Sequence, residues 1–157
     1  ELEARIQEQA GDVQNEYHNE FFIKRLDFEN AGRASHAIKK VLKDRGLPPD
    51  IVRRASVAAY ELEINIAVHS NGGKLTFHLT PDVLTIQAID EGPGIENVED
   101  AVREGYSTAN DWIRSLGFGA GMGLANTKRF SDSFKIDSTL GGSTSVTSVI
   151  YTAPKTT

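Results

Sequence analysis

Glu61 and Asn65 lie four residues apart in a segment predicted to be helical, so their side chains project from one face of the helix. Glu61 interrupts an otherwise apolar stretch, which continues through residues 64–68. A carboxylate and a carboxamide held near a core suit a hard divalent cation such as Mg²⁺, which takes few protein oxygens and keeps several waters. For this pair alone, a solvated polar face or a local hydrogen bond is the alternative interpretation.

A second candidate group is Asp90, which follows an alternating run at residues 83–89 and opens the turn Glu91-Gly92-Pro93-Gly94-Ile95. Glycines in such a turn allow the chain to approach a ligand closely. A carboxylate at this point can accept a hydrogen bond from an exocyclic amine, as adenine offers. An ordinary turn after a strand uses the same residue types, so that interpretation also stays open.

The third candidate is a glycine-rich run at residues 117–124, which reads Gly-Phe-Gly-Ala-Gly-Met-Gly-Leu. Alternating glycines leave a row of exposed backbone N–H groups that leads into a predicted helix, and such an arrangement can bind phosphate. The run is neither a Walker loop nor a GxGxxG dinucleotide fingerprint. A flexible hinge is the alternative for this segment.

The elements that must position these groups follow from periodicity and from turn residues. The mixture of helices and hairpins predicts an α+β fold, a two-layer sandwich in which helices cover one face of a mixed, mostly antiparallel sheet. We expect helices near residues 29–43, 51–69, 98–104 and 124–131, and strands near residues 21–26, 74–80, 83–89, 134–138 and 144–151.

The first twenty residues look separate from this domain. One thin apolar stripe at helical spacing predicts an N-terminal helical extension over residues 1–20. The domain itself is then expected over residues 21–152, followed by a tail at residues 153–157. The stripe consists of Leu2, Ile6, Ala10, Val13 and Tyr17.

Composition limits the class of protein. The 157 residues are 39% hydrophobic and 25% charged, as in one ordinary globular domain, and there is no cysteine for a disulfide, a thiol nucleophile or a thiolate metal site. No apolar run has the length of a membrane helix and nothing resembles a signal peptide, so we expect a cytoplasmic protein without a membrane partner. A net charge of −5 argues against nucleic-acid binding. Residues 33–54 nevertheless hold seven bases against two acids.

Taken together and in this order, the three candidates resemble the Bergerat-fold (GHKL) ATPases. Glu61-x-x-x-Asn65 stands where that superfamily has its N box, Asp90-x-Gly92-x-Gly94 is similar to its first glycine box, and Gly121-x-Gly123-Leu124 to its second. The resemblance implies the Bergerat, histidine-kinase-like ATPase fold.

Further residues resemble one branch, the small serine kinases and anti-sigma factors of the RsbT and RsbW type. The similar segments are residues 65–69, 90–95, 104–108, 119–124 and 128–134. Two features depart from the pattern. Residues 109–116, with the only tryptophan, Trp112, lengthen the lid over the nucleotide, and the segment before Phe21 is additional.

The resemblance implies an ATP-dependent serine/threonine kinase with ATP and Mg²⁺ as cofactors. It makes Glu61 the general base, Asn65 the metal ligand and Asp90 the acceptor of the adenine amine. The nucleotide-binding residues that it implies are Asn65, Asp90, Gly92, Gly94, Ile95, Ser107, Thr108, Gly117, Gly119, Gly121, Met122, Gly123 and Leu124.

The implied substrate is a serine or threonine of a small STAS-type antagonist. The alternative function is a non-catalytic, nucleotide-sensing module that captures a sigma factor or another regulator, and a homodimer is open in either case. A clamp ATPase is disfavoured because the chain lacks a second transducer domain. A histidine-kinase role is weakened because His36 is followed by Ala37-Ile38 rather than by an acid and a base.

Overall fold

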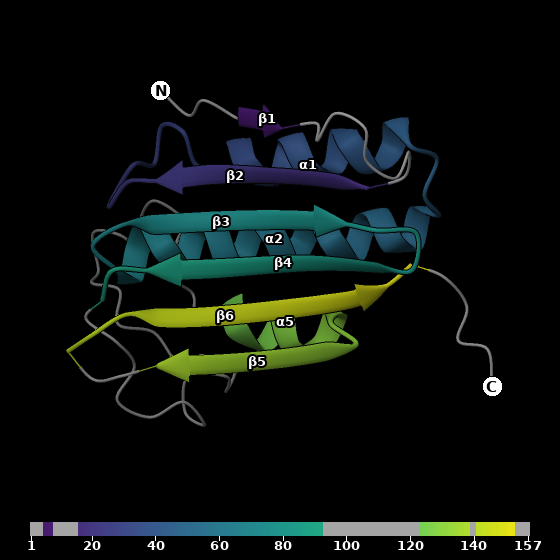
Figure 1. The fold of residues 1–157 in the computed structure, drawn as a ribbon. Coiled ribbons are helices and arrows are strands. Elements are labelled where there is room, and N and C mark those ends of the chain that lie inside the picture. The colour runs from purple at the N-terminus through teal and green to yellow at the C-terminus, as the bar shows by residue number, and fades with distance from the viewer. Residues whose placement is uncertain (1–4, 8–15, 93–122, 139–140, 153–157) are drawn as a thin grey trace.

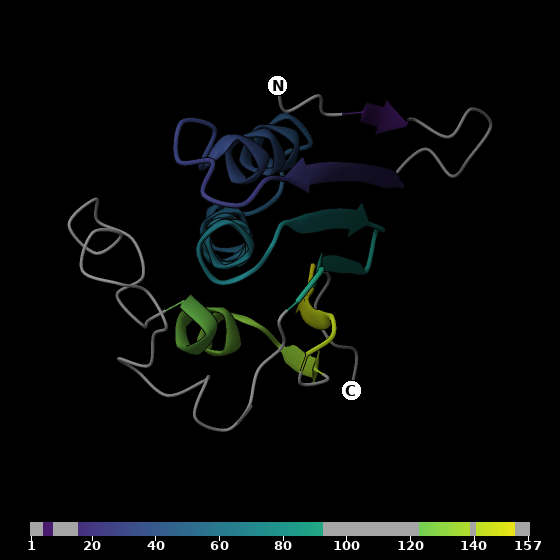
Figure 2. The same cartoon turned by 90° about the vertical axis from the view of Figure 1, so that its left-hand side faces the viewer.

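The computed structural model describes residues 5–7, 16–92, 123–138 and 141–152, which form one antiparallel sheet and three helices on one of its faces (Figures 1 and 2). The predicted two-layer α+β architecture is therefore confirmed, and every strand pairing among the described residues is antiparallel. The sheet has six strands in the order β1-β2-β3-β4-β6-β5. Their bounds are Arg5–Gln7 for β1, Tyr17–Ile23 for β2, Gly73–Leu79 for β3, Val83–Asp90 for β4, Ser133–Ser138 for β5 and Thr144–Tyr151 for β6.

Alternation along the strands creates the core. Every second residue of the central strands is buried against the helices, and the residues between them face the open side of the sheet, as expected for a sheet with one covered face. The buried rows on the two central strands are Leu75, Phe77 and Leu79 on β3, and Leu84, Ile86 and Ala88 on β4.

The helical layer is built around α2, Pro49–His69, which packs against α1, Arg33–Asp44, on one side and α5, Gly123–Phe130, on the other. Pro49 is well suited to the first turn of α2 because its missing N–H has no helical acceptor there. At the other end, the Ser70 hydroxyl donates to the carbonyl of Ile66 at 2.6 Å. Figure 2 shows the three helices together on one side of the strands.

The expected N-terminal helix is wrong wherever the structure describes it. Residues 5–7 are strand β1, and β2 already begins at Tyr17 and pairs with β3. Pairing gives these residues backbone hydrogen bonds, and it buries Tyr17 and Phe21, whereas a helix with one thin apolar stripe would bury little. Strand pairing between distant segments has therefore outweighed the weak helical periodicity of the apolar residues in this part of the sequence.

Two other boundaries differ from expectation near the turn between β2 and α1. The strand ends at Ile23 because the chain turns at Leu26, which has a positive φ of 57°. The helix begins at Arg33 rather than near residue 29, since Asp27 accepts hydrogen bonds from Asn30 and holds a turn. The expected helix at residues 98–104 and the lengthened lid at residues 109–116 lie outside the described residues.

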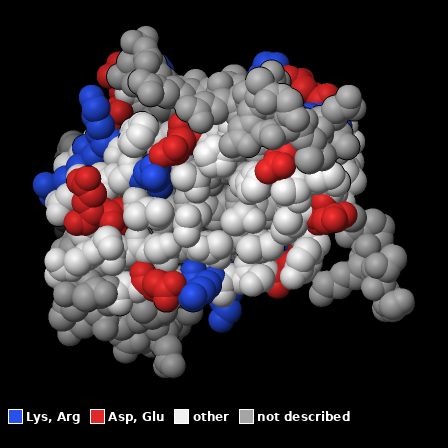
Figure 3. All heavy atoms as spheres, viewed as in Figure 1, with Lys and Arg blue, Asp and Glu red and all other residues white. Residues whose placement is uncertain are grey.

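The open face of the sheet, seen in Figure 3, is covered mainly by uncharged side chains. Several of its charges stand in pairs of opposite sign, such as Lys74 with Glu20 at 3.0 Å and Lys135 with Asp137 at 3.4 Å.

None of the helices in the described part of the chain has the length and apolar character that crossing a membrane requires.

Candidate functional site

The first candidate catalytic residue is Glu61, which lies on α2 where that helix meets the first turn of α5. A hydrogen bond from the Asn126 side chain reaches the Glu61 carboxylate. A Cβ added at Gly123, the first residue of α5, would stand 3.1 Å from Oε2 of Glu61. The carboxylate therefore faces the N-terminal end of α5, where backbone N–H groups and the helix dipole favour an anion.

Burial raises the pKa of the Glu61 carboxyl above its ordinary value of 4.5, and the hydrogen bond from Asn126 opposes that rise. A carboxylate with a raised pKa is a better proton acceptor than an exposed one. Glu61 thus combines partial burial, a fixed orientation and an affinity for protons, which are the properties of a general base.

Asn65 lies one turn further along α2. Its side chain is half-buried between the buried residues Ile64 and Ile66, and among the described residues its amide has no hydrogen-bond partner. The side-chain oxygen of Asn65 therefore accepts no hydrogen bond in this part of the structure. It is available to a hard cation that keeps most of its waters. The residues present on α2 therefore fit a Mg²⁺ ion carried by phosphates.

Asp90 ends β4 and continues the inward-facing row of that strand. Its Oδ1 accepts the N–H of Gly92 at 2.8 Å and the N–H of Thr144 at 3.1 Å, so the carboxylate is fixed between two segments. Burial raises the pKa of Asp90, and these two backbone hydrogen bonds lower it. No hydrogen bond from the described residues reaches Oδ2, which leaves a fixed acceptor for a donor such as an amine.

Backbone hydrogen bonds tie the end of α2 to the turn after Asp90. The N–H of Asn71 donates to the carbonyl of Gly92 at 3.0 Å, and the N–H of Glu91 donates to the carbonyl of Gly72 at 3.0 Å. Gly73 must be a glycine here, because an added Cβ would stand 2.3 Å from the carbonyl oxygen of Ile89. The structure therefore joins the two segments on which Asn65 and Asp90 were predicted.

The glycine motifs are described only in part. Gly92 has a positive φ of 107°, Gly123 begins α5, and Leu124 is a core residue with 7% of its surface exposed. Leu124 therefore contributes packing under α5. The other predicted nucleotide-binding positions lie outside the described residues and stay predictions: Gly94, Ile95, Ser107, Thr108, Gly117, Gly119, Gly121 and Met122.

Sequence reasoning missed Glu63, a carboxylate that is only 1% exposed. Its Oε2 accepts the N–H groups of Gly32 at 3.0 Å and Ala34 at 3.2 Å, and its Oε1 accepts the N–H of Ser35 at 3.1 Å. Gly32 offers no capping side chain, so Glu63 caps α1 from a neighbouring helix. The one local signal was a second acid in the apolar stretch of α2. Asn126 was missed as well.

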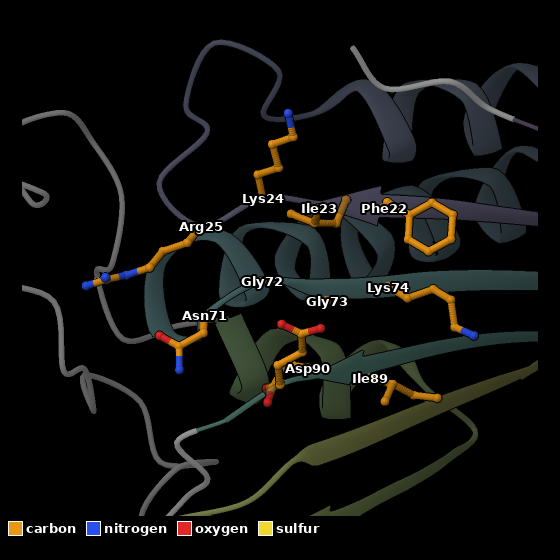
Figure 4. A pocket seen from close by; sticks show the side chains of 11 residues that line it. Phe22, Ile23, Lys24, Arg25, Asn71, Gly72, Gly73, Lys74, Ile89 and Asp90 are labelled. Carbon is orange, nitrogen blue, oxygen red and sulfur yellow. The ribbon is translucent and has the colours of Figure 1, made fainter.

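A hollow of about 520 Å³ lies at the edge of the open face, between the end of β2 and the turns around Gly72 and Asp90 (Figure 4). Phe22, 62% exposed, lines it together with Lys24 and Arg25. In Figure 4 these two cations point away from one another, so they do not converge on one anion. Glu61 and Asn65 do not line this hollow, because they lie on α2 in the helical layer.

Histidines and acids do not form a metal centre in the described part of the chain, where no group of three or more such side chains could hold an ion. His69, at the end of α2, is mostly enclosed, and burial lowers its pKa. His78 instead contacts Glu16 at 2.7 Å on the open face of the sheet.

Comparison with known proteins agrees with this geometry. Residues 25–149 match the family described as "Histidine kinase-like ATPase domain". The fold is similar to a chain in the crystal structure of the SiaB–SiaC complex from Pseudomonas aeruginosa, with a TM-score of 0.52 and 13% identity over 83% of this chain and 89% of that one. The predicted fold family is therefore confirmed.

Two curated relatives bear on the branch. The chain is 29% identical to the serine/threonine-protein kinase RsbT of Bacillus subtilis, over 71% of this chain and 80% of that protein. It is 28% identical to an anti-sigma F factor of Caldanaerobacter subterraneus subsp. tengcongensis, over 85% of each chain. The resemblance to small regulatory kinases and anti-sigma factors is thus confirmed.

Proposed function

Because the chain belongs to the family of histidine kinase-like ATPase domains, we propose that it is an ATP-dependent serine/threonine kinase that switches a small STAS-type regulatory partner. The observation that carries this proposal is the position of Glu61. This half-buried carboxylate is oriented by Asn126 and faces the first turn of α5 beside Gly123. A module that only sensed nucleotide would not need a proton acceptor there.

The nucleotide would be held by residues from three segments. Oδ2 of Asp90 would accept the adenine amine while Oδ1 stays bonded to the backbone of Gly92 and Thr144. Asn65 would contribute an oxygen to Mg²⁺. The backbone at the start of α5 would bind phosphate oxygens together with residues 117–123, which include Gly117, Gly119, Gly121, Met122 and Gly123. The other nucleotide-binding residues predicted from the sequence are Gly92, Gly94, Ile95, Ser107, Thr108 and Leu124.

In the transfer step, Glu61 accepts the proton of the partner's serine or threonine hydroxyl. Bound Mg²⁺-ATP supplies an activated γ-phosphoryl group. The hydroxyl oxygen forms the new bond to the γ-phosphorus as the bond from that phosphorus to the β–γ bridging oxygen breaks, and ADP leaves with that electron pair. Such transfer depends mostly on positioning and charge neutralisation, which fixed side chains and a helix N-terminus provide.

A second candidate function is favoured by one observation. Several of the similar curated proteins are named anti-sigma F factor rather than kinase. On that reading the chain captures a sigma factor or another regulator according to the bound nucleotide. The same site residues would bind ATP, but Glu61 would have no proton to accept.

Capture with two nucleotides separates the candidates. The purified chain is immobilised and exposed to native lysate with Mg²⁺ and either ATP or ADP, and the retained proteins are searched for new phosphoserine and phosphothreonine by mass spectrometry. A Glu61→Gln chain is the matched control, because it keeps the size and a hydrogen-bonding oxygen. We expect a retained protein that gains phosphate with the parent and not with the control. A retained protein that gains none with either chain favours the non-catalytic module.

A further inference from the structure

A groove of about 420 Å³ runs between α1 and α2 on the outer side of the helical layer. One wall comes from α1, with Ser35, His36 and Lys39, and the other from α2, with Ser56 and Tyr60. Glu61 also lines it. The groove is therefore continuous with the residue that the proposed function makes the base.

Glu61 lies between two different environments. On one side, Asn126 and Gly123 of α5 approach its carboxylate. On the other side is the groove against α1. Since α2 packs between α1 and α5, a hydroxyl that enters along the groove would reach the same carboxylate that borders the start of α5. For transfer, the attacking oxygen must lie between the carboxylate and the γ-phosphorus, roughly in line with the leaving oxygen.

Lys39 gives the α1 wall of the groove a positive charge. His36 and Lys39 are exposed, stand three residues apart on one face of α1 and both line the groove. The neighbouring Lys40 is paired with Asp44 at 2.8 Å, whereas Lys39 has no ion pair among the described residues. In a protein with a net charge of −5, this wall is a local exception that favours an acidic partner.

Tyr60 completes the opposite wall. Tyr60 is 39% exposed, although Ala58 and Ala59, which precede it on α2, are fully buried. Partial burial and the nearby carboxylates of Glu61 and Glu63 raise the pKa of its phenol, so Tyr60 stays neutral at physiological pH. An aromatic ring with a polar tip on a groove wall suits the backbone and side chains of a bound peptide segment.

We propose that the groove between α1 and α2 is the docking site for the segment of the partner that carries the acceptor serine or threonine, and that this segment is acidic. The inference rests on the proposed kinase function and specifies its substrate. The acceptor hydroxyl lies at Glu61, and an acidic side chain next to it in the partner pairs with Lys39. Tyr60 packs against the segment from α2.

The probe is a pair of fluorescent peptides of equal length with one central serine, flanked by glutamates in the first and by glutamines in the second. Binding to the full chain is measured by anisotropy with Mg²⁺ and a non-hydrolysable ATP analogue. We expect the acidic peptide to bind at least tenfold more tightly. Lys39→Glu should remove this preference. The matched control is Lys24→Glu, because Lys24 is an exposed lysine that lies outside the groove and also has no ion pair in the described part of the chain.

Equal binding of the two peptides, or equal effects of Lys39→Glu and Lys24→Glu, would overturn the docking site. The proposed kinase function would remain supported in that case if the parent transfers phosphate to a captured protein. The opposite combination is also informative. Binding of the acidic peptide through Lys39 without transfer to any captured protein would make the groove part of a non-catalytic module, and the acceptor role would fall together with the kinase.

Discussion

Gly123 lies so close to Glu61 that a Cβ at position 123 would stand 3.1 Å from Oε2 of the carboxylate. This contact is tighter than ordinary van der Waals packing, so any side chain at position 123 would push Glu61 away from the start of α5. A glycine at position 123 therefore lets the Glu61 carboxylate lie against the start of α5.

Gly123→Ala should slow phosphate transfer because it displaces the Glu61 carboxylate. Stability should change little, since alanine favours a helix by up to about 1 kcal/mol relative to glycine and the crowding opposes this gain. The check is a double-mutant cycle of transfer rates. Adding Gly123→Ala to Glu61→Gln should cost nothing further, because the base is already lost. Fully additive losses would show that Gly123 acts independently of Glu61.

Glu63→Gln should destabilise the fold by about 1–3 kcal/mol, because one buried acceptor of the three N–H groups at the start of α1 becomes a donor. Urea unfolding measures the loss. Glu29→Gln, at an exposed position in the loop before α1, is the matched control and should be neutral. Equal stability of the two variants would mean that Glu63 does not hold α1.

The pH dependence of stability should report the raised pKa of Glu61. In the folded chain its carboxyl holds its proton to a higher pH than in the unfolded chain, where its ordinary value is 4.5. Glu61 therefore contributes a loss of stability as the pH rises from about that value through its folded pKa, and Glu61→Gln lacks this contribution. The stability of Glu61→Gln relative to the parent should increase with pH and then level off. A constant difference, or one that falls, would contradict the burial of this carboxyl.

Asp90→Asn should weaken ATP binding by about 1–3 kcal/mol, roughly 5- to 150-fold. Asparagine can keep the Oδ1 bonds to Gly92 and Thr144, so the change falls on the free acceptor and not on the turn. Calorimetric titration with ATP and GTP measures it. The parent should prefer ATP, and equal affinity for GTP would overturn the adenine assignment.

The sequence predicted the parts of this fold that local patterns determine. The hairpin of β3 and β4 follows from alternation on both sides of Pro81-Asp82, and α2 follows from its long apolar period between Pro49 and the Asn71-Gly72-Gly73 break. The pair Glu61 and Asn65 was identified for the same reason, because four residues on one helix fix a shared face without any tertiary information.

Other features depend on contacts between distant segments and could not be found locally. Ile6 is placed by its pairing with Asn19, so a short edge strand was mistaken for a helix. Glu63 caps a helix whose N-cap residue, Gly32, lies 31 residues earlier in the chain. Asn126 is separated from Glu61 by the whole β3–β4 hairpin, and only packing of α5 on α2 brings their side chains together.

Single-turnover transfer from Mg²⁺-ATP to the captured partner tests the kinase proposal most directly, with ATP affinity measured in parallel for the parent, Glu61→Gln and Asn65→Ala. A general base contributes typically about 10²–10⁴-fold to the chemical step and little to binding. Glu61→Gln should therefore bind ATP almost as the parent does and transfer phosphate slower by about that factor, whereas Asn65→Ala should lose Mg²⁺-dependent binding and transfer together. Transfer by Glu61→Gln at the parental rate would contradict the account, because the carboxylate between α2 and α5 would then not be the base.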